Sequence, residues 1–557
     1  MRGRFNKLLS VALACALFFL LGAFVADQTS APALTREIVA SAEKLIGLNF
    51  SDAKRDSMLD GLKDQATSYQ NIRKVALPNS IPPAITLNPI PVGMKFDTVR
   101  KSFIMSKPGK VTVPANFDDL AFYSIGQLAE LVKSRKITSE QLTTMYLNRL
   151  KKYSPKLECV ITITGDLAMK QAKAADAEIA AGKYRGPLHG IPCGVKDLLA
   201  AKGYKTTWGS VPFKDQMIDE DATVVKKLEE AGAVLIAKLT MGELAWGDVW
   251  YGGRTRNPWK YEQGSSGSSA GSASATSAGL VAFSIGTETW GSIVSPSTRC
   301  GTTGLRPTYG RVSRTGAMAL AWSMDKIGPI CRTVEDCALV FNAIYGPDGK
   351  DQTLYDVPFN YNPKIDLREL KVGYLKDDFD SVKTNKANDD SSFAVLERLG
   401  AKLIPISLPK LPISDLSIIL SAEAGAAFDD LTRSGKDDLL VRQIKNAWPN
   451  SFRESRFIPA VEYIQANRVR YLAIQEMGKL MSRVDVIVAP PFEGDNSLLT
   501  NLTGHPCVVV PNGFSKEGTP TSITFLGKLF DEATLLAVAK QYQDATDFHL
   551  KHPKIQK

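Results

Sequence analysis

A lysine and several closely spaced serines are the residues whose types and positions suit chemistry. Lys196 lies in "GVKD", inside an apolar stretch. Burial there disfavours the ammonium form, which lowers the pKa of the side chain and lets the lysine act as a base near neutral pH. Two structural alternatives stay open: a salt bridge with the adjacent Asp197, or a surface lysine that keeps its ammonium in water.

The serines gather in residues 265–279, "SSGSSAGSASATSAG", a composition typical of a flexible linker. The next residues, 280–297, read "LVAFSIGTETWGSIVSPS", an apolar strand or helix that ends in a second small-residue turn around Gly291 and Ser292. A linker leads to a new domain rather than to another tight turn. The pattern therefore leaves two hypotheses, a linker and a reactive site.

Other chemistries find little support in the sequence. The chain has only four histidines, so a Ser-His-Asp triad is not indicated. We expect His189 to orient a loop rather than to transfer protons. No cluster of His, Cys, Asp and Glu has metal-ligand spacing, and no glycine-rich nucleotide motif follows a strand. We expect neither a metal nor a cofactor.

Composition and charge bound the class of protein. The 557 residues are 44% hydrophobic and 23% charged, as in a globular chain. The net charge is +10, but lysines and arginines alternate with acidic residues instead of forming a stripe, so we predict no nucleic-acid partner. Oligomeric state is not indicated.

The N-terminus has the order of an export signal, with basic residues ahead of an apolar run at 8–26. Residues 1–26 are therefore predicted to be a signal peptide or an uncleaved membrane anchor, with 8–26 as a possible tether. Either way, we expect the protein outside the cytoplasm: periplasmic, secreted or membrane-anchored.

Two further regions follow. Residues 27–117 form a predicted appendage, with helical periodicity up to residue 75 and then an extended, proline-punctuated run at 79–93. From 118 to 557 helical and strand patterns alternate; Thr138 or Ser139 is expected to cap one of the helices. The predicted fold class is α/β, a mixed twisted β-sheet covered by helices on both faces.

Several motifs together resemble the amidase signature family of serine hydrolases. In chain order they are "PLHGIPCGVKD", "GSSAGS", "GTETWGSIVSP", "TTGLRPTYGRVSRTGAM", "DKIGPICRTVEDCALVFNAIYGPD", "TNLTGHPCVVVPNGF" and "FDEATLLAVAKQYQDATDFH". The resemblance covers about residues 123–549 and implies that residues 118–557 form an amidase domain. It favours a reactive site over a linker for the serine-rich segment.

The resemblance implies a Ser-Ser-Lys triad. It makes Ser292 the nucleophile and Ser268, which lies 24 residues earlier and follows a cis peptide bond, the bridging serine. Lys196 is the base, and Ser269 at most supports the site by a hydrogen bond. The oxyanion hole is expected from backbone N–H groups of the turn formed by Thr289, Trp290, Gly291 and Ser292.

Three positions depart from the commonest family pattern. Glu288 stands where aspartate is usual, and Val294 where many members have arginine. The pair of residues that supports the oxyanion turn is therefore missing or rebuilt, and Glu288 is expected to take part in it. Trp290 replaces a small residue; it either walls the acyl pocket or packs in the core.

The implied function is hydrolysis of a carbon–nitrogen amide bond in a small molecule through an acyl-enzyme, by an exported amidase whose substrate is not indicated. Two alternatives come from other classes. One is a subunit of a glutamine amidotransferase, which releases ammonia for transfer to a charged tRNA. The other is a catalytically silent binding protein on the same scaffold, since a fold does not fix a function.

Overall fold

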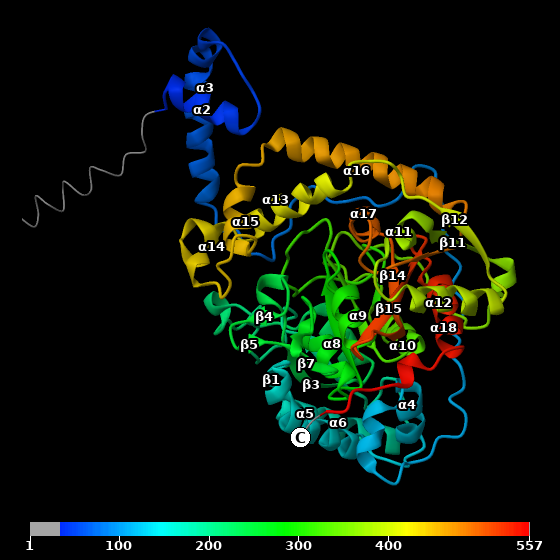
Figure 1. The fold of residues 1–557 in the computed structure, drawn as a ribbon. Coiled ribbons are helices and arrows are strands. Elements are labelled where there is room, and N and C mark those ends of the chain that lie inside the picture. The colour runs from blue at the N-terminus through cyan, green and yellow to red at the C-terminus, as the bar shows by residue number, and fades with distance from the viewer. Residues whose placement is uncertain (1–33, 556–557) are drawn as a thin grey trace, which may run out of the picture. The chain divides into compact units, whose positions relative to one another are not determined.

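The structure, a computed structural model, describes residues 34–555 (Figure 1). The predicted leader at 1–26 lies outside the described residues. The described part of the chain divides into two compact units, with the boundary between Pro78 and Asn79. Within 34–555, none of the helices has the length and apolar character needed to cross a membrane.

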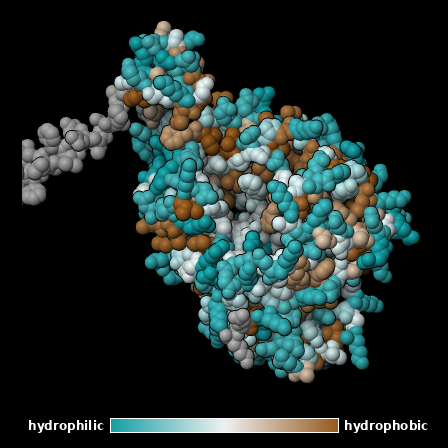
Figure 2. Space-filling model, in the orientation of Figure 1, coloured by the Kyte–Doolittle hydropathy of each residue, from teal (hydrophilic) through white to brown (hydrophobic). Residues whose placement is uncertain are grey.

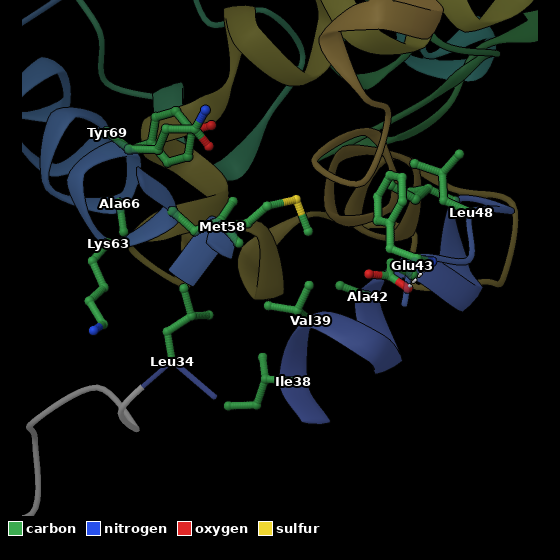
Figure 3. Close-up of a pocket in the computed structure, with 14 residues that line it drawn as sticks. Leu34, Ile38, Val39, Ala42, Glu43, Leu48, Met58, Lys63, Ala66 and Tyr69 are labelled. Atoms are coloured by element: carbon green, nitrogen blue, oxygen red, sulfur yellow. Dashed lines mark hydrogen bonds between the residues drawn. The ribbon is translucent and has the colours of Figure 1, made fainter. Parts of the chain in front are cut away.

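The described part of the first unit is a helical hairpin of α2 (Arg36–Leu45) and α3 (Asp52–Arg73). Glu43 of α2 is buried and pairs with Arg55 of α3 at 2.8 Å. Apolar residues stand out among hydrophilic ones on the surface of this unit (Figure 2). An apolar groove lies between the helices (Figure 3); its lining includes Leu34, Ile38, Val39, Ala42, Leu48, Met58, Ala66 and Tyr69.

An eleven-stranded sheet forms the centre of the second unit. Its order is β1-β3-β2-β8-β10-β9-β14-β15-β13-β11-β12. The strands are β1 (Val160–Ile163), β2 (Pro192–Lys196), β3 (Val234–Leu239), β8 (Phe283–Glu288), β9 (Thr303–Arg306), β10 (Lys326–Cys331), β11 (Lys371–Leu375), β12 (Lys402–Ile406), β13 (Val486–Ala489), β14 (Cys507–Phe514) and β15 (Pro520–Gly527). Two small ribbons accompany it: β4 (Val249–Trp250) with β5 (Gly253–Arg254), and β6 (Arg256–Asn257) with β7 (Lys260–Gly264).

The sheet is mixed. Strands β3, β2 and β8 run parallel to one another, as do β13, β11 and β12. The strands between these two groups pair antiparallel. Many of the central strands, β2, β3, β8 and β10 among them, are buried along their whole length, as expected when both faces of a sheet are covered. The predicted α/β fold with a helix-covered mixed sheet is confirmed.

Helices surround the sheet. The α-helices are α4 (Ile125–Lys133), α5 (Ser139–Leu157), α6 (Gly165–Ala180), α7 (Thr223–Glu230), α8 (Ala270–Ser277), α9 (Val294–Cys300), α10 (Val334–Ile344), α11 (Lys376–Ser381), α12 (Lys386–Arg398), α13 (Ile418–Ala427), α14 (Asp429–Arg433), α15 (Trp448–Ser455), α16 (Ala460–Met481), α17 (Asn496–Thr503) and α18 (Glu532–Asp544). The 3₁₀ helices are η2 (Phe117–Phe122), η3 (Val211–Phe213), η4 (Glu243–Ala245), η5 (Leu367–Glu369), η6 (Ser414–Ser417), η7 (Lys436–Leu439) and η8 (Phe548–Leu550).

Local sequence explains where helix α5 begins. Thr138 caps α5: its side chain accepts the Gln141 N–H, and the Gln141 side chain accepts the Thr138 N–H. This reciprocal pair satisfies two N–H groups that an uncapped helix would leave without partners. Of the two predicted caps, Thr138 is therefore the one used.

Residues 79–117 lie along the rest of the second unit. Asn79 donates to the Ala319 carbonyl at 2.9 Å, and the Ser106 N–H donates to Glu335 at 2.7 Å. The Phe103 ring stacks on Tyr361 at a centroid distance of 5.3 Å. The proline-punctuated residues 79–93 contain neither helix nor strand, as predicted.

The order of strands decides which residues meet. Lys196 ends β2 and Glu288 ends β8; the two strands are parallel neighbours, so their carboxyl ends lie at the same edge of the sheet. Helices α8 and α9 lie side by side in the middle of the unit (Figure 1). The serine-rich segment thus leads into a buried helix beside β8, and it is not a linker.

Candidate active site

Lys196 is the centre of a buried cluster of hydroxyl groups. Its side chain is fully buried, and its Nζ lies 2.8 Å from Ser268 Oγ and 3.2 Å from Ser269 Oγ. Thr287 Oγ1, on the neighbouring strand β8, lies 2.8 Å from the same nitrogen. The structure therefore brings two of the residues selected from the sequence, Ser268 and Ser269, around the Lys196 amine, and adds Thr287, which sequence reasoning missed.

Asp197 does not pair with Lys196. Its Oδ1 lies 2.9 Å from Nζ of Lys238 on β3, and its Oδ2 accepts the N–H and the hydroxyl of Thr207 at 2.8 and 2.6 Å. Lys196 is the last residue of β2 and Asp197 the first residue of the turn that follows, and the two side chains have separate partners. The salt-bridge alternative for Lys196 is wrong, and so is the surface alternative.

Burial lowers the pKa of Lys196 to about 7, because a charged ammonium loses its hydration there. The carboxylates of Asp325 and Glu288 act in the opposite direction but do not cancel this effect. At neutral pH a substantial fraction of the lysine is therefore unprotonated and can accept a proton.

Ser268 follows a cis peptide bond from Gly267, as the resemblance implied. The loop of residues 242–247 packs directly on this bond: the Gly242 N–H donates to the Ser268 carbonyl at 3.2 Å. A Cβ on Gly267 would lie 1.8 Å from the Gly247 carbonyl oxygen. Only glycine fits at 267, so this loop fixes the backbone that carries Ser268.

Ser269 links the parts of the site. Its hydroxyl donates to the Thr287 carbonyl at 3.0 Å and accepts the Thr287 N–H at 3.1 Å. Its own N–H donates to the Ser292 carbonyl at 3.2 Å. Ser269 thus forms hydrogen bonds with Lys196, with β8 and with Ser292, the predicted nucleophile. These bonds agree with the supporting role expected of Ser269.

Ser292 lies in the turn between β8 and α9. In the described part of the chain its hydroxyl has no hydrogen-bond partner, and the backbone N–H groups of Trp290, Gly291 and Ser292 donate to no acceptor. Gly291 has φ +78° with open space where a Cβ would point. The turn therefore presents a free hydroxyl beside free N–H donors, the arrangement that a developing oxyanion needs.

Trp290 lies in the same turn and is 48% exposed. Of the two hypotheses for this residue, packing in the core is wrong. Trp290 stands at the surface, two positions before Ser292 in the chain.

Glu288 supports the turn from behind. Its Oε2 accepts the N–H groups of Ile293 and Val294 at 2.8 and 3.0 Å. Its Oε1 accepts from Arg306 on β9 at 2.7 Å and from Asn501 on α17 at 2.9 Å. The expected pair is thus rebuilt: Arg306 supplies the guanidinium that Val294 does not.

The electrostatics of Glu288 fit this arrangement. Burial alone raises the pKa of Glu288, but the Arg306 charge and the hydrogen bonds from Asn501 and Ile293 outweigh it and lower the pKa to about 2. With this pKa the Glu288 carboxylate is ionised near neutral pH. It accepts hydrogen bonds from two consecutive N–H groups and so fixes the end of the turn.

We expect Glu288→Gln to destabilise the fold. The neutral amide leaves the buried Arg306 guanidinium without its counter-charge, a change that typically costs about 3–5 kcal/mol. Urea denaturation at pH 7 measures the loss. The control is Glu517→Gln, which removes an exposed pair with Lys260 and should leave the midpoint unchanged. Equal midpoints for the two variants would contradict the supporting part given to Glu288.

Asp325 is a second residue that sequence reasoning missed as part of the site. Its Oδ1 accepts the Thr289 hydroxyl at 2.5 Å, and its Oδ2 accepts the N–H groups of Leu320 and Ala321 at 2.8 and 3.0 Å. Burial raises the pKa of Asp325. It ties the predicted oxyanion turn to the loop that precedes β10.

Metal ligands and histidines play no visible part in this geometry. Within residues 34–555, no group of three or more His, Cys, Asp and Glu side chains could hold a metal ion. His189 Nδ1 accepts the Arg185 N–H at 3.1 Å, which fits the loop-orienting part expected of it.

We compared the chain with known protein families, curated proteins and solved structures to identify the class of protein to which this fold and lysine–serine cluster belong. A family model described as Amidase matches residues 141–495. The chain belongs to the amidase signature family, and it is an amidase-family enzyme that acts on carbon–nitrogen bonds.

Two similar curated proteins are subunits of amidotransferases. A glutamyl-tRNA(Gln) amidotransferase subunit of Acinetobacter baumannii (strain AB0057) is 36% identical, over 78% of this chain and 99% of the relative. The protein of the same name from Carboxydothermus hydrogenoformans is 34% identical, over 78% of this chain and 100% of its own length.

Among solved structures, the native peptide amidase of Stenotrophomonas maltophilia matches with a TM-score of 0.71 and 29% identity, over 79% of this chain and 100% of that one. The corresponding glutamyl-tRNA(Gln) amidotransferase subunit of Thermotoga maritima matches with a TM-score of 0.67 and 26% identity, over 81% and 100%.

Proposed function

We propose that the chain hydrolyses a carboxamide through Ser292, with Ser268 and Lys196 as a proton relay. The observation that carries the proposal is the 2.8 Å contact between Lys196 Nζ and Ser268 Oγ, formed by a fully buried lysine. The free hydroxyl and free N–H groups of the turn at Ser292, within the described residues, support it. A silent binding protein would need none of these features.

The relay works in two directions. Neutral Lys196 accepts the proton of Ser268 while Ser268 accepts that of Ser292, and Ser292 Oγ attacks the amide carbonyl carbon. Hydrogen bonds between catalytic groups often form only when substrate is bound, which fits the free Ser292 hydroxyl. The N–H groups of residues 290–292 stabilise the oxyanion; one such donor is typically worth about 10²–10³ in rate.

Collapse of the tetrahedral intermediate breaks the carbon–nitrogen bond. The relay returns the proton to the departing nitrogen, which leaves as a neutral amine or as ammonia, and the acyl group stays on Ser292 as an ester. Water then attacks this ester while the relay accepts its proton. The acid is released and the Ser292 hydroxyl is restored.

The pKa of Lys196 predicts the pH dependence. Only the unprotonated amine accepts a proton, so kcat/KM for amide hydrolysis should rise with pH and reach half of its plateau near pH 7. Below that point it should fall about tenfold per pH unit. A pH–rate profile from about pH 5 to pH 9 measures this. A flat profile across that range would rule out Lys196 as the base.

For the substrate, the curated relatives favour the amidotransferase alternative over the exported amidase that the leader predicts. The relatives, by their name, act with glutamyl-tRNA(Gln), whereas one of the solved structures is by its title a peptide amidase. Both hypotheses share the same hydrolytic step.

Localisation and partners separate these two hypotheses. We propose that the chain is exported, because basic residues precede an apolar run within residues 1–26. This proposal rests on the sequence alone. A tagged chain at native expression level is fractionated, and co-purifying proteins are identified. An extracytoplasmic chain that purifies alone supports the exported amidase. A cytosolic chain in a stable complex that releases ammonia from glutamine supports the amidotransferase hypothesis and contradicts export.

A further inference from the structure

The charge of Arg442 has no counter-ion among the described residues. Its guanidinium stacks over the Trp246 ring, 4.3 Å from the centroid, and within the described residues this guanidinium takes part in no hydrogen bond or ion pair. An arginine side chain is always protonated in proteins and carries five N–H donors. Arg442 is partly exposed, and none of its nitrogens is among the buried atoms without a partner, so these donors are open to solvent and to a ligand.

The loop under Arg442 leads directly to Ser268. Trp246 and Gly247 follow η4, and a Cβ on Gly247 would lie 3.2 Å from Arg442 Nη1. The carbonyl oxygen of the same Gly247 packs on Gly267, the residue that precedes Ser268. One residue of backbone therefore separates the guanidinium from the peptide that carries the bridging serine.

Neighbouring contacts hold Arg442 in place without neutralising it. The Val441 N–H donates to Glu243 Oε2 at 2.7 Å, and Ser210 donates to Glu243 Oε1 at 2.9 Å, so both oxygens of this carboxylate have other partners. Trp448 Nε1 donates to the Leu244 carbonyl at 3.0 Å. The segment before α15 is thus fastened to the loop at 242–247 while the Arg442 charge stays available.

We propose that Arg442 is a substrate-binding residue that recognises a carboxylate, so that the chain prefers amides that carry one near the scissile bond. A guanidinium binds a carboxylate through two parallel hydrogen bonds, and stacking on Trp246 presents it in a fixed orientation. The carboxylate belongs either to the acyl part or to the amine part of the substrate. This inference rests on the proposed function.

The test uses activated esters, which acylate a reactive serine whatever the natural amide. In the acyl arm, the mono-p-nitrophenyl ester of pentanedioic acid is compared with p-nitrophenyl pentanoate. In the leaving-group arm, the acetate ester of 3-(4-hydroxyphenyl)propanoic acid is compared with phenyl acetate. Arg442→Met should lower kcat/KM for the charged ester of one arm by about 10- to 100-fold, the range of a charge-assisted hydrogen bond.

For the neutral esters, kcat/KM of Arg442→Met should differ from wild type by less than about threefold, because these esters have no carboxylate to bind the guanidinium. Arg442→Lys, which keeps the charge without the fork, should fall between wild type and Arg442→Met. Arg468→Met is the matched control, because Arg468 is an exposed arginine on α16, and it should behave as wild type.

Each outcome has a definite meaning. Selective loss in either arm supports the inference and says which side of the substrate carries the carboxylate. Equal loss on charged and neutral esters in both arms means that Arg442 only packs on Trp246, and overturns the inference while the proposed function stands. A wild-type chain that reacts with none of the esters overturns the proposed function and this inference with it.

Discussion

Ser292→Ala lowers kcat for amide hydrolysis by about 10⁴- to 10⁶-fold, the loss typical of removing a nucleophile from a hydrolase. Alanine leaves the free N–H groups of the turn in place, so binding and oxyanion stabilisation survive while the acyl-enzyme cannot form. The effect should appear in kcat rather than in KM. Steady-state kinetics with any amide that the wild type turns over measures it.

A serine in the same polar stretch provides the control for this substitution. Ser266 Oγ shares a hydrogen bond of 2.6 Å with Ser295 Oγ, and among the described residues it has none with Lys196, Ser268 or Ser292. Ser266→Ala should therefore stay within about threefold of wild type, as expected for a residue outside the chemistry. If Ser292→Ala kept as much activity as Ser266→Ala, Ser292 would not be the nucleophile.

Lys196→Met has the second large effect and lowers kcat for amides by about 10²- to 10⁴-fold, the range of general base catalysis. The residual rate should lose the fall below pH 7, because the titrating amine is gone. Methionine fills a similar volume without a buried amine, so a thermal melt at or above that of the wild type separates lost chemistry from lost folding.

Lys196→Arg sharpens the same experiment. The guanidinium keeps a positive charge and hydrogen-bond donors next to Ser268 and Ser269, but it cannot lose a proton at any working pH. It should therefore fail to restore activity. Recovery of amide hydrolysis by arginine would show that position 196 supplies charge rather than basicity.

Lys196, Ser268 and Ser269 were predictable from local sequence, whereas Thr287 was not. An apolar strand that ends in lysine buries the amine, and the "GSSAGS" and "GTETWGS" segments are local patterns that resemble a known family. Caps such as Thr138 are local as well, because a threonine and a glutamine three residues later satisfy each other.

What the sequence did not predict depends on residues far apart in the chain. Glu288 meets Arg306 and Asn501 only because the fold brings β8, β9 and helix α17 together. Asp197 meets Lys238 because β3, which carries Lys238, pairs with β2. One feature of the sequence could have indicated this support. The motif "TTGLRPTYG" contains an arginine, Arg306, which could replace the arginine that Val294 does not supply.

The most direct test of the account is the position of the acyl adduct. Trypsin is unsuitable, since Ser268 and Ser292 lie on one peptide between Lys260 and Arg299. A protease that cleaves after glutamate separates them at Glu288. Enzyme trapped with a slow substrate, digested in this way and fragmented by mass spectrometry should carry the acyl group on Ser292. An adduct on Ser268, or on another serine, would contradict the assignment of the nucleophile and of the relay.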